Sequence, residues 1–251
     1  MESTSRRKFF KQSLGAVAAI AVTAKVAEAA VCKLTERQTS GPFIPNDFPF
    51  KDPRGEGAPH IQVAESDADL TVIEQNGQLL TAQGQVIHVL GKVVDQSCTP
   101  VAGATVYLWQ ADDHGHYNHA EDPNVRSSSD LDHGFQYRAS VTTQRDGSFR
   151  FKTVKPKYYP LDETGSMMRT AHLHIAVLHP RCQQLITQTY FEGNVLEDIE
   201  RIRELNQTDI ILAPQGKILE KFRSLIIDFK MNPAVASEPV GEVTLTVNRI
   251  S

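Results

Sequence analysis

"RTAHLHIAV", residues 169–177, places His172 and His174 two positions apart inside an apolar run. Alternate residues of a β-strand lie on the same side, so the two imidazoles face one way and Leu173 faces the other. The strand rise separates the two histidine Cα atoms by about 6–7 Å, which allows both imidazoles to reach one metal ion. Two solvated histidines on a polar strand face would give the same pattern, so the remaining sequence decides between these interpretations.

A β pattern extends outward from this stretch in both directions. Apolar alternation and turn residues predict strands at 85–95, 104–111, 171–180, 184–192, 223–231 and 241–250, and a hairpin over 137–154 that turns at Asp146-Gly147. Only 194–206 has a helical pattern, with apolar residues at three-residue steps. Many short strands with one short helix predict an all-β sandwich or barrel.

The first 29 residues have the composition of an export signal. Arg6, Arg7 and two lysines precede a short apolar stretch, which ends before the small-residue pattern Ala27-Glu28-Ala29. The paired arginines resemble a twin-arginine (Tat) signal, which predicts export of the folded protein to the periplasm or beyond, with cleavage after Ala29. The alternative is an amphipathic N-terminal helix of the folded domain. We find no run of about 18 apolar residues, so no membrane span is expected.

Residues 30–80 are predicted to form an N-terminal arm, and residues 81–251 the main domain. The stretch "TSGPFIPNDFPFKDPRGEGAP" (39–59) contains five prolines, which is typical of a segment laid over a domain and not of a core. Near the end of the arm, "DADLTVIEQNGQLL" (67–80) predicts a short hairpin that turns at Asn76-Gly77.

Charge and cysteine content restrict the partners and the compartment. Cleavage after Ala29 would leave 21 basic and 28 acidic residues, a formal charge of −7. No basic cluster remains that would follow a phosphate backbone, so nucleic acid is not an expected partner. An exported protein meets an oxidising compartment, so one disulfide and one free thiol are expected among Cys32, Cys98 and Cys182, with all three pairings open.

Tyrosines supply the other candidate ligands. Tyr117 lies in the polar loop "DHGHYNH", and Tyr158 and Tyr159 lie in a loop that ends at Pro160. Two phenolates and two imidazoles form a hard, electron-rich set of ligands that suits Fe(III) better than Zn²⁺. An unperturbed phenol titrates near pH 10, so only a strong Lewis acid would hold two of them ionised at neutral pH.

These segments resemble the intradiol ring-cleavage dioxygenases, the family of protocatechuate 3,4-dioxygenase and catechol 1,2-dioxygenase. "GKVVDQSCTPVAGATVYLWQADDHGHYNH" is similar to the family's strand-turn-strand entry, in which a tyrosine follows the Trp-Gln pair by eight residues. "FKTVKPKYYP" resembles the stretch that leads to its second tyrosine, and "RTAHLH" resembles its Arg-Pro-Ala-His-Ile-His. "LITQTYFEG" matches Leu-Ile-Thr-Gln-x-Tyr-Phe-Glu-Gly, and "TSGPF" resembles part of the family's arm. The similarity covers about 35–230 in order.

The resemblance implies a β-sandwich fold and a non-haem Fe(III) cofactor held by Tyr117, Tyr159, His172 and His174. It also implies that Arg169 lies beside the substrate and stabilises developing negative charge, with Gln188 lining the same pocket. In the family a catechol displaces the second tyrosine, here Tyr159, whose phenolate accepts a substrate proton. The implied reaction inserts O2 into a catechol-type diol and gives a muconate-type diacid. Homo-oligomers occur in the family and are possible here.

Several residues depart from the family pattern or lie outside it. Thr170 replaces the usual proline, and Leu161-Asp162 stands where Trp-Arg is common in protocatechuate enzymes, which predicts a different pocket wall. Tyr158 is predicted to be structural. The loop histidines are expected to be solvated, with a second metal site as the alternative: His114, His116 and His119. Two other functions stay open: a catalytically silent β-sandwich binding module, and an exported zinc- or copper-binding protein that uses the histidine pair.

Overall fold

The computed structural model describes residues 31–50, 59–63, 66–162 and 164–250. The expected export signal, residues 1–29, lies outside the described residues. Within these ranges, no helix combines the length and the apolar character that crossing a bilayer requires.

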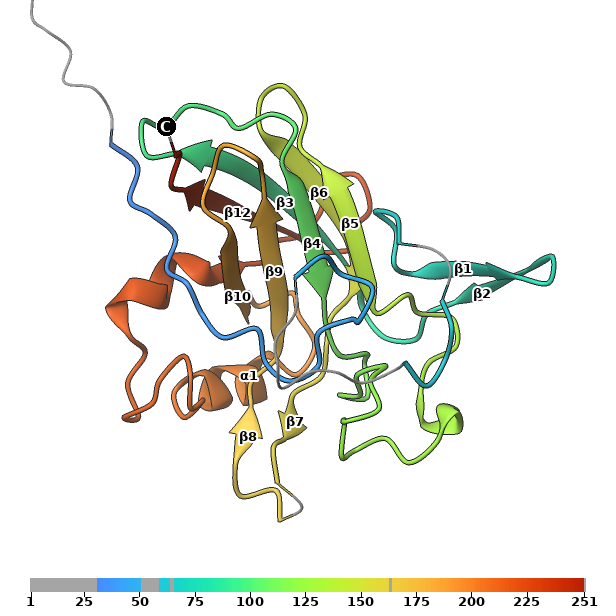
Figure 1. The fold of residues 1–251 in the computed structure, drawn as a ribbon. Helices are drawn as coiled ribbons and strands as arrows, with labels where there is room; N and C mark the ends of the chain where they lie inside the picture. Colours follow the sequence, from blue (N-terminus) through green and yellow to red (C-terminus); the bar gives the residue numbers. More distant parts are fainter. Residues whose placement is uncertain (1–30, 51–58, 64–65, 163, 251) are drawn as a thin grey trace, which may run out of the picture.

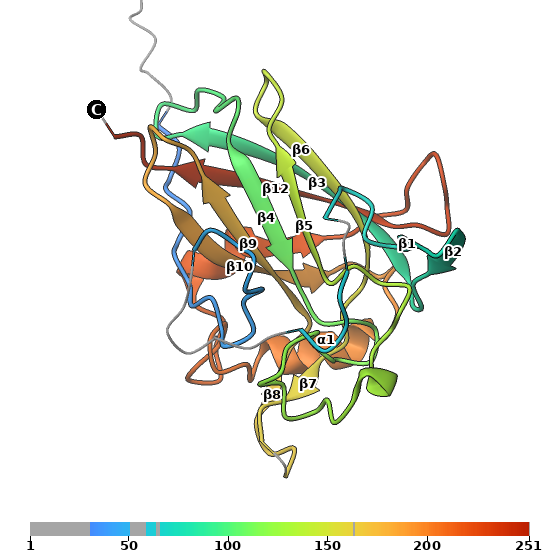
Figure 2. The same cartoon turned by 45° about the vertical axis from the view of Figure 1, so that its right-hand side comes forward.

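Two packed sheets form the body of the molecule, as Figures 1 and 2 show from two sides. The larger sheet has, in spatial order, β11 (Ile226–Asp228), β10 (Leu185–Glu192), β9 (His172–Leu178), β4 (Thr105–Trp109) and β5 (Arg138–Thr142). The smaller sheet has β12 (Val240–Val247), β3 (Val86–Asp95) and β6 (Ser148–Val154). The predicted all-β sandwich is confirmed, and each of these strands overlaps a segment that the sequence predicted to be extended.

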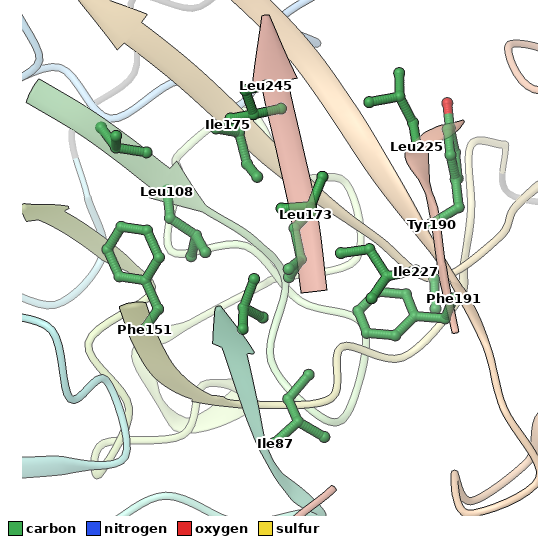
Figure 3. Packing of buried hydrophobic residues seen from close by; sticks show 14 of the residues in the cluster. Ile87, Leu108, Phe151, Leu173, Ile175, Tyr190, Phe191, Leu225, Ile227 and Leu245 are labelled. Atoms are coloured by element: carbon green, nitrogen blue, oxygen red, sulfur yellow. The ribbon is translucent and has the colours of Figure 1, made fainter. Parts of the chain in front are cut away.

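The main core fills the space between the two sheets (Figure 3). Leu173 and Ile175 of β9 pack there with Leu108 of β4, and Phe151 and Leu245 come from the opposite sheet. All five side chains are at most 1% exposed. Because side chains alternate along β9, burying Leu173 and Ile175 inward places His172 and His174 on the outer face of the larger sheet.

Shorter elements surround the sandwich. The predicted hairpin is confirmed as β1 (Val72–Gln75) and β2 (Gln78–Thr81), and both turn residues between them have positive φ. A second, very small hairpin was not predicted; it pairs β7 (Tyr159–Pro160) with β8 (Met168–Arg169). Short 3₁₀ helices occupy η1 (Ser128–Asp130) and η2 (Glu220–Leu225).

The α-helix begins later than its apolar pattern suggested. The sequence predicted 194–206, whereas α1 spans Ile199–Asn206. Asp198 has a φ of 55°, in the left-handed region, so the preceding residues cannot continue the right-handed helix. Figure 1 shows α1, β7 and β8 gathered beyond the ends of β9 and β10, at one end of the sandwich.

The N-terminal arm runs along the outer face of the larger sheet and is attached at its start. A disulfide joins Cys32 to Cys98 in the β3–β4 turn, so Cys182 is the free cysteine and is buried. Further along, the amide of Thr35 donates to the carbonyl of Thr246, and the amide of Gln38 donates to the carbonyl of Ile186.

The arm contributes more to the interior than the sequence suggested. Its prolines indicated a segment outside any core, but Phe43, Ile44, Phe48 and Phe50 are each at most 8% exposed. These four side chains form a second hydrophobic cluster with Trp109 and others on the outer face of the larger sheet. That expectation was wrong because the outer face is itself apolar, and four large side chains of the arm cover it.

Candidate metal centre

The histidine pair lies on the outer face of β9, beneath the arm. The Nε2 atoms of His172 and His174 are 3.2 Å apart. The Nδ1–H group of His172 donates to the carbonyl oxygen of Thr170 at 2.7 Å, which fixes the tautomer and leaves the Nε2 lone pair free. His174 stacks on Trp109 with ring centroids 4.8 Å apart. Gly41 of the arm lies so close that a Cβ atom added to it would be 3.1 Å from Cε1 of His174.

Tyr117 reaches the same point from the loop that follows β4. Its hydroxyl oxygen is 3.0 Å from His174 Nε2 and 3.3 Å from His172 Nε2. The Asp122 carboxylate accepts the Tyr117 amide at 2.7 Å, which fixes the backbone at this position.

A second carboxylate, Asp112, organises the start of this loop. Asp112 Oδ1 accepts the amides of His114 and His116, and Asp112 Oδ2 accepts the hydroxyl of Tyr137. The loop that carries Tyr117 is therefore held by two buried carboxylates and not by regular secondary structure.

Tyr159 and Arg169 form the only cross-strand pair of the β7–β8 hairpin in which both residues are buried. The ring of Tyr159 meets that of Tyr117 edge to face at 5.4 Å, and its centroid is 5.7 Å from that of His172. A Cβ atom added at Gly115 would lie 3.1 Å from Tyr159 Cβ, so glycine permits the close approach of the two loops. The structure thus brings the four predicted ligands together.

The donor atoms fit a metal of the first transition row. Ligands about 2.0–2.1 Å from one ion and roughly 90–110° apart lie about 3 Å from each other. The three distances among Tyr117 Oη, His172 Nε2 and His174 Nε2 are 3.0, 3.2 and 3.3 Å. Across the described ranges, no group of three or more His, Cys, Asp or Glu side chains could hold a metal, so a site here depends on tyrosine oxygens.

Burial sets the protonation of these groups in the protein alone. Burial, together with the charge of Arg169, lowers the pKa of both imidazoles well below its usual value, so His172 and His174 are neutral. Burial raises the pKa of Tyr159, and the positive charge of Arg169 partly opposes this rise. The pKa of Tyr117 is raised well above its usual value, first by burial and then by the neighbouring Tyr159. A metal bound here would meet two neutral imidazoles and would have to displace the protons of the two phenols.

Arg169 and Gln188 lie at the edge of this cluster. Arg169 Nη2 donates to Gln188 Oε1 at 2.6 Å, and Arg169 Nε donates to Asp209 Oδ2 at 2.9 Å. Gln188 Nε2 in turn donates to the carbonyl of Thr39, on the arm. Sequence reasoning identified Arg169 and Gln188 but missed Asp209, because "NQTDIIL" around it matches no motif and gives no sign that a carboxylate there is buried.

The other residues that the sequence singled out have different surroundings. Tyr158 is half-buried, with the cations of Lys157 and Arg201 near its ring, and lies against the main core. The three loop histidines differ: His114 is exposed and His116 half-buried, but His119 is 2% exposed and packs against Phe43. Solvation of His119 was therefore a wrong expectation, because the arm covers it.

Leu161 and Asp162, which depart from the family pattern after Tyr159, have different surroundings. Leu161 is half-buried and packs against the cluster that contains Tyr159 and Trp109. The Asp162 carboxylate accepts hydrogen bonds from Thr164, Ser166 and the amide of Met167, all within the β7–β8 hairpin. Asp162 therefore closes its own turn, and the apolar Leu161 is the one that faces the cluster.

Known proteins are similar in sequence to half of this chain or more. The family model described as "Dioxygenase" matches residues 56–233. The chain belongs to this dioxygenase family. The β chain of protocatechuate 3,4-dioxygenase from Burkholderia cepacia is 34% identical over 132 residues, which cover 52% of this chain and 54% of that protein. Hydroxyquinol 1,2-dioxygenase from Nocardioides simplex is 28% identical over 218 residues, 82% of this chain and 59% of that protein.

A solved structure agrees on the fold of this dioxygenase family member. The dioxygenase domain of a carbohydrate-binding fusion protein from Streptomyces sp. SirexAA-E aligns with a TM-score of 0.53 and 23% identity, covering 87% of this chain and all of that domain. The chain spans about half the length of the curated relatives it matches.

Proposed function

We propose that this chain is an Fe(III)-dependent intradiol dioxygenase, which inserts O2 into a catechol-type diol and gives a muconate-type diacid. The observation that carries the proposal is the convergence of Tyr117, His172 and His174 at 3.0–3.3 Å, with Tyr159 beside them. Family membership and the names of the relatives support the same reaction class. The donor set favours ferric iron, because phenolate oxygens are hard ligands.

Each residue of the site has a role in the proposed reaction that follows from its position. Bound ferric iron would supply the Lewis acidity that ionises the phenols and draws electron density from the substrate ring. Tyr159 Oη would accept a proton from the diol. Arg169, fixed and cationic, would stabilise negative charge that develops on the ring. Gly41 and Phe43 of the arm exclude water from the histidine and Tyr117 side.

Purified protein loaded with iron tests the proposal. We expect a burgundy colour from tyrosinate-to-iron charge transfer, and O2 uptake with catechol. Tyr117→Phe should abolish O2 uptake and weaken the visible band, because Tyr159 alone would then supply the tyrosinate. Tyr158→Phe is the matched control, because that ring lies beside Lys157 and Arg201 and not among the donor atoms, and should leave both signals unchanged.

The same measurements discriminate the alternatives. A catalytically silent binding module would take up no O2 with any substituted catechol, and a zinc protein would be colourless. Either result would refute the dioxygenase proposal. A series of ring-substituted catechols then identifies the preferred substrate. Leu161-Asp162 in place of Trp-Arg predicts a pocket wall that differs from that of protocatechuate enzymes.

We also propose that the protein is exported through the Tat system. The paired arginines and the cleavage pattern before residue 30 support this proposal. The Cys32–Cys98 disulfide fits it, since disulfides persist in oxidising compartments. N-terminal sequencing of protein from the periplasm of a Gram-negative host should begin at Ala30. Replacing Arg6 and Arg7 by lysine should leave the precursor in the cytoplasm; processing at the normal level would contradict Tat export.

A further inference from the structure

The buried carboxylate of Asp209 binds the guanidinium of Arg169. Asp209 follows α1 in the chain and is 0% exposed. Its Oδ2 atom accepts Arg169 Nε at 2.9 Å and the Thr170 amide at 3.0 Å. Its Oδ1 atom accepts the amides of Ile211 and Leu212, both at 2.9 Å. Four N–H donors thus converge on one carboxylate.

The guanidinium of Arg169 is held on two sides by these contacts. Asp209 holds it at Nε, and Gln188 holds it at Nη2. Gln188 is itself fixed by the carbonyl of Thr39 on the arm. Because two nitrogens of the planar guanidinium are hydrogen-bonded, the side-chain torsions of Arg169 are fixed. The orientation of the guanidinium toward Tyr159 is therefore set before any ligand binds.

The hydrogen bond from the Thr170 amide to Asp209 also fixes the backbone directly before β9, the strand that carries the two histidines. A proline here, as in the sequence that this segment resembles, would have no N–H to donate. Thr170 Oγ1 also donates to Asn206 Oδ1 at 2.7 Å, and Asn206 Nδ2 donates to the carbonyl of Phe191 in β10. Through these bonds the last residue of α1 and the following turn hold residues 169–170, directly before His172.

We propose that Asp209 is a positioning residue that orients Arg169 for the ring-cleavage reaction and fixes the entry into β9 through the Thr170 amide. This inference rests on the proposed function. The role requires a carboxylate, because each of its two oxygens accepts two N–H groups. An amide at this position would place its NH2 group against one of these pairs of N–H donors. An apolar residue would leave the buried cation of Arg169 without its charge partner.

Steady-state kinetics of the iron-loaded Asp209→Asn variant test the proposal. Misorientation of a group that acts on the transition state should lower kcat about 10- to 100-fold. KM for catechol should change much less, so that kcat/KM falls in parallel with kcat. The iron content and the visible tyrosinate band should stay at wild-type values, which a general loss of structure would not allow.

A second variant and a remote control keep the test valid if Asp209→Asn folds poorly. Thr170→Val keeps the amide and the charges but removes the bond to Asn206, so it should lower kcat in the same direction by a smaller factor. Thr143→Val removes buried hydrogen bonds to Val101 and Ala104 at the opposite end of the larger sheet. It should lower the melting temperature and leave kcat unchanged.

Crystal structures of the metal-free proteins separate this inference from the proposed function. If wild-type protein does not cleave catechol, the proposed function fails, and the position of Arg169 then decides the inference. Arg169 should keep its contact with Gln188 in the wild type and leave it in Asp209→Asn. Wild-type kcat in Asp209→Asn, or an unmoved guanidinium in its crystal structure, would overturn the positioning role.

Discussion

Glycine at position 41 is required by two separate physical constraints. Its φ of 73° lies in the left-handed region, and a Cβ atom there would lie 3.1 Å from Cε1 of His174. Gly41→Ala should therefore add backbone strain of about 1 kcal/mol and also push the imidazole from its place. We expect iron affinity to fall about 10-fold, since small shifts around a metal ligand have effects of that size. Competition with a chelator of known affinity measures it.

Gly103 provides the matched control for this substitution. Its φ is 76°, but a Cβ atom there would meet nothing within 4 Å. Gly103→Ala should lower the free energy of unfolding by a similar amount and leave the iron affinity as it is. Equal losses of iron affinity in both variants would show that backbone strain, and not contact with His174, is responsible.

Tyr137 is another residue whose backbone is strained near the site. It has a φ of 62°, which is unusual for a bulky side chain, and it is buried. Its hydroxyl donates to Asp112 Oδ2 and accepts the Asp132 amide at 2.7 Å. Tyr137→Phe would leave that buried amide without an acceptor, so we expect a loss of about 2 kcal/mol in urea unfolding.

Tyr107→Phe is the comparison for this prediction. Tyr107 is half-buried, and its hydroxyl makes no hydrogen bond to the described part of the chain. Its removal should change stability by less than about 0.5 kcal/mol. If Tyr137→Phe were equally neutral, the bonds to Asp112 and Asp132 would not be what holds the Tyr117 loop.

Individual site residues differed in how far the sequence could predict them. Strand alternation predicts that His172 and His174 share a face, since i and i+2 lie on the same side, but their assignment as ligands also needed the tyrosines and the family resemblance. The choice of Tyr159 over Tyr158 came from the resemblance, and the structure places Tyr159, not Tyr158, against Tyr117. Asp209 had no such signal, because its partner Arg169 is 40 residues away and nothing local marks a carboxylate that a distant arginine will neutralise.

At the scale of elements, both the disulfide and backbone hydrogen bonds attach the arm to the two sheets. Cys32 and Cys98 are separated by 66 residues, and closing a loop of this length is worth about 4 kcal/mol in the chain-entropy account. The Cys32→Ser/Cys98→Ser double variant should lose up to about that amount in urea unfolding. Activity below the transition should persist, because Thr35 and Gln38 still bind the arm to the sheet.

Cys182→Ser and reduction complete the test of the arm. Cys182 is buried and forms no disulfide, so Cys182→Ser should cost much less than the double variant. Dithiothreitol should lower the stability of wild type and Cys182→Ser but leave the double variant unchanged. Loss of activity on reduction at a temperature where the protein stays folded would instead show that the disulfide alone keeps the arm over the site.

Elements were predictable to the extent that their own residues carry the signal. β12 has apolar alternation, and β9 has alternation followed by an apolar run, so both were predicted to within three residues of their bounds. The two-residue strands β7 and β8 are too short for any periodicity. The disulfide pairing stayed open among three possibilities, because it depends on the path of the arm, which only the packed structure defines.

The whole molecule places its candidate metal site outside the sandwich core and under a covering segment. The two sheets hide Leu173 and Ile175 between them, and the arm hides His172 and His174 on the other side of the same strand. A one-residue shift of register would move the two imidazoles into the apolar core and turn Leu173 and Ile175 to the outer face, so burial on both sides opposes it. This arrangement fixes the two imidazoles through the packing of the entire fold.

Iron should therefore stabilise the arm and the sheet as one unit. A metal that binds only the folded protein adds about 4 kcal/mol when its free concentration is 1,000 times its dissociation constant, so loading should raise the melting temperature. Hydrogen exchange measured by mass spectrometry should slow in the arm around residues 38–50, which lies over Tyr117 and His174. The β1–β2 hairpin, far from these donor atoms in the fold (Figure 1), provides the internal control and should exchange at the same rate with and without iron. Equal slowing in both segments would indicate a general effect on stability, and no slowing in the arm would show that it does not close over the metal.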